Sequence, residues 1–133
     1  MNVERYLHPI FLISMVLGII GAIMGVIVWG KDPYAGFLWL LISVPIALFS
    51  LGGSLRVKMA KDIETKAGIG IQHSWWVLSF GFSGLILFPA PFFVQHGGAG
   101  YAYSMTVISL IWVILGIIGI YKPHADTGVS ITI

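Results

Sequence analysis

The sequence contains no cysteine. This absence excludes a disulfide framework, a CxxC redox pair, an iron–sulfur cluster held by thiolates and a thiol nucleophile. It leaves open which redox compartment the protein occupies.

Charged residues are also scarce. They make up 9% of the 133 residues, whereas a soluble domain has about 25%. Seven basic and five acidic side chains are too few to cover the surface of a soluble protein of this length. The net charge of +2 is too small to indicate a nucleic-acid partner. With 58% hydrophobic residues, the composition predicts a protein whose solvent is lipid.

The hydrophobic residues form four long runs that contain no Asp, Glu, Lys or Arg. Each run reaches the length of about 20 residues that a membrane-spanning helix needs. Backbone groups in hydrocarbon must be paired within their own segment, which favours helices, and the alternating polarity of a membrane barrel is missing. The predicted spans are residues 7–29, 34–53, 73–94 and 101–121.

We therefore predict an all-α integral membrane protein, a single domain over residues 1–133 with four transmembrane helices arranged as two antiparallel hairpins. The first run is too long for a cleaved signal peptide, and no A-x-A site follows it. The turn WGKDPYAG and the short segment QHGGAG close the two hairpins. Between them, residues 54–72 are expected to form a basic loop, and residues 122–133 a polar C-terminal tail.

The distribution of basic residues predicts an orientation. With four spans, both termini and the segment 54–72 share one side of the membrane, and the other side has Lys31. The first side carries six basic residues: Arg5, Arg56, Lys58, Lys61, Lys66 and Lys122. By the positive-inside rule, this excess of six basic residues over one predicts a protein of the cell membrane with both termini in the cytoplasm. Two states of the segment 54–72 stay open, a solvated loop or one that begins with helical turns at the interface.

Glycines are unusually frequent for helices, and 17 are present. Glycine costs about 1 kcal/mol against alanine in a water-exposed helix, but in lipid small residues let helix backbones approach closely. Gly21 and Gly25 form a GxxxG motif. We predict helix-packing surfaces at Gly18, Gly21, Ala22, Gly25, Gly81, Gly84, Gly116 and Gly119. Pro45, Pro89 and Pro91 should bend or break their helices.

Ligand or interface candidates are few. His8 and His73 are expected at the same cytoplasmic boundary, where together they could hold a metal or contact a quinone head group, although two ligands make a weak metal site. Trp75 and Trp76 fit either a stacking platform for a ring-shaped ligand or the aromatic belt at a membrane interface. His96 is expected on the opposite side, in a glycine-flanked loop.

No catalytic residues are predicted, because the mid-span polar groups are hydroxyls with no neighbouring base. The leading hypothesis is a small accessory or scaffold subunit of a larger membrane complex, such as a respiratory oxidase or a membrane-bound monooxygenase. Its partners would be membrane lipids and other integral membrane subunits, with no cofactor of its own beyond a bound lipid or quinone. A small oligomeric transporter or channel, and an interfacial enzyme of lipid or quinone chemistry, are the alternatives.

Overall fold

The computed structural model describes the backbone of residues 4–127 and the side chains of residues 7–122. Within that range the regular structure is entirely helical, which confirms the predicted all-α class. The helices are α1 (Glu4–Lys31), α2 (Pro33–Met59), α3 (Ile63–Leu87), α4 (Pro91–Gly97) and α5 (Ala99–Thr127).

The protein is a multi-span membrane protein. Three segments of the described chain are long and apolar enough to cross a bilayer unaided: Leu7–Lys31, Pro33–Met59 and Ala99–Lys122. A fourth crossing requires α3 and α4 together, and these two helices meet at an angle of 82°. The third predicted span, residues 73–94, thus falls on this bent pair of helices.

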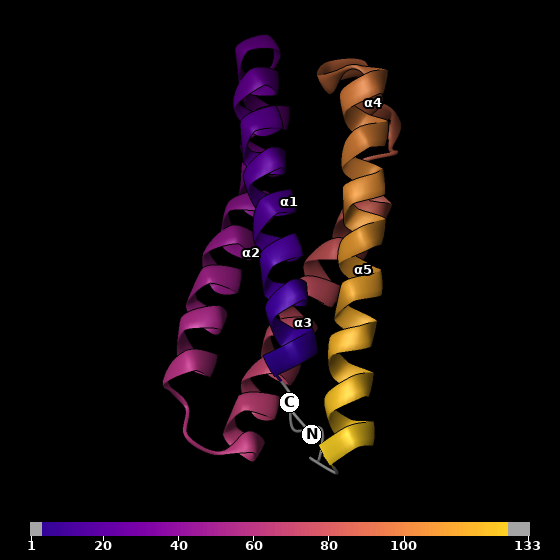
Figure 1. Cartoon of the computed structure of the whole chain (residues 1–133). Helices are drawn as coiled ribbons and strands as arrows, with labels where there is room; N and C mark the ends of the chain where they lie inside the picture. The colour runs from indigo at the N-terminus through magenta and orange to yellow at the C-terminus, as the bar shows by residue number, and fades with distance from the viewer. Residues whose placement is uncertain (1–3, 128–133) are drawn as a thin grey trace.

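The helices form two antiparallel pairs, α1 with α2 and α3 with α5 (Figure 1). The first turns of α1, the connection between α2 and α3, and the last turns of α5 lie at one end of the bundle. The α1–α2 turn and α4 lie at the other end. The first of these is called the basic end below, because Arg56, Lys58, Lys61 and Lys66 belong to it.

The expected basic loop 54–72 is mostly helical. Residues 60–62 are the connection, and the rest belongs to the end of α2 and the start of α3. Asp62 caps α3 by accepting a hydrogen bond from the backbone N–H of Thr65, at 3.3 Å. The first half of α3 also buries Ala67, Gly70 and Ile71. Hydropathy does not detect this half because polar and charged residues, among them Glu64, Lys66 and Gln72, interrupt its isoleucines. Packing against other helices keeps it helical.

The proline-rich segment after α3 breaks the helix, as predicted. The α3 helix ends at Leu87. Pro91 occupies the first turn of α4, where a backbone N–H would have no partner within the helix, so proline costs no hydrogen bond there. Gly98 then turns the chain into α5 with a φ of 92°, which a residue with a side chain rarely adopts. By contrast, α2 continues through Pro45. The expected tail is helical as far as Thr127, and its remaining residues lie outside the described part.

Glycines on one helix face serines on the next. The Ser43 hydroxyl fills the space beside Gly21. In the same way, the Ser74 hydroxyl lies beside Gly119, and the Ser109 hydroxyl lies beside Gly84. In each case a glycine Cβ would collide with the serine side chain. These pairs join α1 to α2 and α3 to α5, so they belong to the two tight hairpins.

The other predicted packing glycines lie against backbone or side-chain atoms of the facing helix. Gly18 lies against Ala47, and Gly25 against Leu40. Gly81 approaches the backbone of Ser109, and Gly116 that of Ser74. Ala22 is half-buried. Close approach also occurs at glycines that the sequence did not nominate: Gly36, Gly53, Gly70 and Gly97.

Trp39 and Trp112 are fully buried and lie in the main core cluster. Trp39 follows the start of α2 by six residues, a position that suits the aromatic belt at a membrane interface. Instead its ring packs between helices, 5.7 Å from the ring of Phe88 and 6.3 Å from that of Phe93. The short helix α4 supplies Phe93, so this tryptophan fixes the bent segment to α2.

Candidate functional site

His73 lies about ten residues into α3, because the helix begins at Ile63 and not near residue 73. Its side chain is 3% exposed. Nε2 lies 2.9 Å from the Ser50 hydroxyl of α2, and the Phe11 ring of α1 meets the imidazole edge-on at a centroid distance of 4.5 Å. Three helices therefore converge on one ionisable side chain within the bundle, a feature that usually marks function in membrane proteins.

The second ring nitrogen of His73 has no hydrogen-bond partner among the described residues. An unsatisfied buried polar atom costs about 1–3 kcal/mol. If the Ser50 hydroxyl donates to Nε2, a neutral His73 carries its proton on Nδ1 and presents an unused donor.

A groove of about 300 Å³ runs between α2 and α3 beside this histidine. Arg56 and Gln72 lie across it, and an Nη of Arg56 donates to Oε1 of Gln72 at 3.3 Å. No atom lies within 4 Å of the position that a Cβ on Gly52 would occupy, so the groove is open at this residue. The lining residues of this α2–α3 groove are Leu48, Phe49, Gly52, Gly53, Arg56, Gln72, His73 and Trp76.

A larger hollow of about 650 Å³ adjoins the α2–α3 groove and is lined by one helix. The two share Gln72 and Trp76. The indole of Trp76 is 45% exposed and stacks on Phe80 at 5.9 Å, whereas Trp75 is half-buried and its indole N–H has no partner in the described region. The residues of this outer face of α3 are Gly68, Gln72, Trp75, Trp76, Ser79, Phe80 and Ser83.

His8 is half-buried and lines a separate groove of about 500 Å³, together with Ser50. Ser50, which contacts His73, therefore lines this groove as well. Within the described residues no three His, Cys, Asp or Glu side chains are grouped as a metal site would need. The predicted pairing of His8 with His73 as metal ligands stays a prediction.

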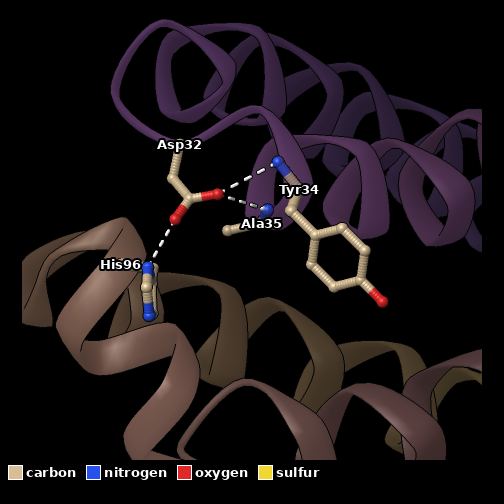
Figure 2. Close-up of polar contacts among 4 residues, drawn as sticks. All are labelled: Asp32, Tyr34, Ala35 and His96. Carbon is tan, nitrogen blue, oxygen red and sulfur yellow. Dashed lines mark hydrogen bonds and ion pairs between the residues drawn. The ribbon is translucent and has the colours of Figure 1, made fainter.

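At the opposite end of the bundle, Asp32 joins the α1–α2 turn to α4 (Figure 2). One carboxylate oxygen accepts hydrogen bonds from the backbone N–H groups of Tyr34 and Ala35, at 3.0 and 3.2 Å, and so caps α2. The other oxygen contacts Nδ1 of His96. The Phe92 ring lies over the imidazole at 4.5 Å. His96, expected in a loop, therefore lies on α4 with a specific carboxylate partner.

The hydrogen bonds at Asp32 lower its pKa below the ordinary value of 3.8, chiefly the bond from the N–H of Ala35, with His96 and Tyr34 acting in the same direction. The ionised form is therefore favoured in the folded protein. Its contribution to stability is present above pH 3.8 and is lost as the pH falls through the lowered pKa.

We expect Asp32→Asn to be less stable than the wild type near neutral pH, and the difference to disappear as the pH falls below 3.8. Thermal unfolding in detergent over a pH series measures this. His96→Ala should keep most of the pH dependence, because the largest cause is the Ala35 N–H. Loss of the whole dependence in His96→Ala would instead assign the effect to the ion pair.

Sequence reasoning missed the partners of His73 and His96. Ser50 is 23 residues from His73, and Asp32 is 64 residues from His96. A signal existed for Asp32, since Asp-Pro at the start of a span is a typical helix cap. For the Ser50 pair no local signal exists, because it depends on how α3 packs against α2.

Comparison of the chain with protein-family models, with curated proteins and with solved structures finds no match. The geometry of these sites is therefore the basis for the function proposed below.

Proposed function

We propose that this protein is a small, non-catalytic subunit of a larger integral membrane complex, and that the outer face of α3 binds a transmembrane helix of its partner. One observation carries this proposal, the difference in chemistry between the outer face of α3 and the outer faces of α1 and α5.

The exposed residues of α1 between Leu12 and Ile27 are all Leu, Ile or Val. The exposed residues of α5 between Val107 and Ile118 are likewise all Leu, Ile or Val. Branched aliphatic side chains suit contact with acyl chains. These two surfaces are therefore assigned to lipid.

The exposed positions of α3 between Gly68 and Ser83 are different. They are Gly68, Gln72, Trp76, Ser79, Phe82 and Ser83. Small residues allow close helix approach in lipid, and a glutamine side chain can hydrogen-bond across a helix pair. The hollow on this face leaves room for a partner's side chains. A helix of another subunit would use the small residues of this face, Gly68, Ser79 and Ser83, for close approach.

The orientation proposed with this function places the basic end, and with it both termini, in the cytoplasm. The structure brings together the helix ends that carry six of the seven basic residues of the chain. The positive-inside rule then assigns that end to the cytoplasmic side of the cell membrane.

We expect Ser79→Leu/Ser83→Leu to abolish co-purification of the partner while leaving the chain folded. The hydroxyl of Ser83 bonds to the carbonyl of Ser79 in its own helix, at 3.0 Å, so leucine leaves no buried group unsatisfied. The measurement is affinity purification of the tagged full-length chain from its own membrane in mild detergent, with the partner quantified by mass spectrometry. Recovery of the partner should fall about tenfold or more.

The matched control is Val16→Leu/Val107→Leu, which enlarges two exposed side chains on the surfaces assigned to lipid. It should retain the partner. Equal loss in both double variants would place the interface elsewhere. Purification of the wild-type chain as a stable monomer without any co-purifying protein would overturn the proposal.

A further inference from the structure

We infer that the α2–α3 groove is a binding site for an anionic phospholipid, with the phosphate held by Arg56 and Gln72 and the upper part of an acyl chain lying along Phe49 and Trp76. This inference concerns a ligand of the chain itself, at a site that shares Gln72 and Trp76 with the outer face of α3.

The position of the groove suits a head group. Arg56 lies one turn before the end of α2, and this end also carries Lys58. Lysines and arginines next to a span end lie at the level of the lipid phosphates. Phe49 precedes Arg56 by seven residues on α2, so it lies about 10 Å further from this end at a helical rise of about 1.5 Å per residue. The groove thus runs from head-group level into the hydrocarbon.

The mouth of the groove has donors for a phosphate. A guanidinium has five N–H donors and binds phosphate oxygens in a fork. The bond to Gln72 uses one of them and leaves the Gln72 amide nitrogen as a further donor. The partner of Arg56 in that bond is a neutral amide, so it does not neutralise the charge. The site is electrostatically complementary to an anion.

The wall of the groove next to Gln72 includes the side chain of His73. This imidazole is 3% exposed and is held in place by its contact with the Ser50 hydroxyl. It therefore forms a fixed, polar part of the wall beside the mouth.

The remaining walls are apolar and aromatic. Phe49 and Trp76 face each other across the two helices, with ring centroids 5.0 Å apart. Leu48 continues this wall. An acyl chain fits such a wall, whereas a free phosphate has no use for it. The basic mouth and the apolar wall together match the order of groups along one phospholipid molecule.

The test is native mass spectrometry of the purified full chain in detergent, titrated with phosphatidylglycerol or with phosphatidylcholine of the same acyl chains. We expect the first bound molecule of phosphatidylglycerol to have an affinity about fivefold higher than the first molecule of phosphatidylcholine. This ratio corresponds to the attraction between one basic side chain and an anionic lipid surface. In Arg56→Gln this preference should fall to about one. Circular dichroism checks that the variant is folded.

Lys58→Gln is the matched control, because it removes the same charge from the same end of α2 at an exposed residue outside the groove. It should keep the fivefold preference. An equal loss in both variants would show that the general positive field attracts the lipid, and would overturn the inference. So would an equal affinity of the wild-type chain for both lipids, or retention of a quinone in the groove that Arg56→Gln leaves unchanged.

A second measurement locates the lipid. Phosphatidylglycerol with bromine in the upper acyl chain should quench tryptophan fluorescence in vesicles, and Trp76→Phe should remove most of the quenching that depends on Arg56. If the Arg56-dependent quenching persisted in Trp76→Phe, the lipid would lie outside the groove. Trp39 and Trp112 are fully buried and serve as the unquenched background.

Discussion

Replacing Gly36 by alanine should separate α1 from α2 and lower the free energy of unfolding by about 1–3 kcal/mol or more. A Cβ on Gly36 would lie 2.5 Å from both the Cα and the backbone nitrogen of Trp29, and 2.7 Å from the carbonyl oxygen of Gly25. These are backbone atoms of the facing helix, so no side chain can rotate to make room. The helices themselves must move, and the contacts along the hairpin weaken with them.

Reversible unfolding by sodium dodecyl sulfate in mixed micelles, followed by circular dichroism, measures this effect. Gly30→Ala is the control, because no atom lies within 4 Å of its added Cβ. Alanine is the better helix former by about 1 kcal/mol in a water-exposed helix, so the control should be neutral or slightly more stable than the wild type. Equal stability of the two variants would contradict the close approach of α1 and α2.

Trp39→Ala should lower the free energy of unfolding by about 2–4 kcal/mol. Lipid is as apolar as the core, so the loss comes from the cavity and the missing contacts, with little contribution from transfer to water. The indole is fully buried and contacts Phe88, Phe93 and Tyr101. These residues belong to the end of α3, to α4 and to α5. The substitution therefore removes the anchor of the bent segment.

The same unfolding measurement applies, with Trp29→Ala as the control. The Trp29 side chain is 45% exposed and meets the Phe37 ring edge-on at 6.3 Å. Its removal leaves no enclosed cavity, so the loss should be well below that of Trp39→Ala. If the control were the more destabilised of the two, the placement of Trp39 in the core would be wrong.

The prediction of a multi-span helical protein succeeded because it depends on properties that lie along the chain. Twenty consecutive apolar residues cannot remain in water, and their backbone groups need helical hydrogen bonds in lipid. The break near Pro89 and Pro91 was also predictable, because proline lacks the N–H that a helix interior requires. Asp32 before Pro33 is a similarly local signal.

The first half of α3 was missed because its helix is maintained by packing. Its small residues face other helices: a Cβ on Gly70 would collide with Leu7, and Ala67 is fully buried. Nothing in the local hydropathy distinguishes such a segment from a loop. This error moved His73 from the interior to a boundary in the sequence-based interpretation, and with it concealed the α2–α3 groove.

The sequence by itself determined the all-helical, multi-span class of this protein and the concentration of its basic residues between the two hairpins. Tertiary structure alone decided which polar groups meet: His73 with Ser50, His96 with Asp32, and Arg56 with Gln72. The physical reason is that apolarity and length are summed along one segment, whereas a hydrogen bond between helices needs two segments at a fixed rotation and height. That register is set by where glycines and serines allow the backbones to approach.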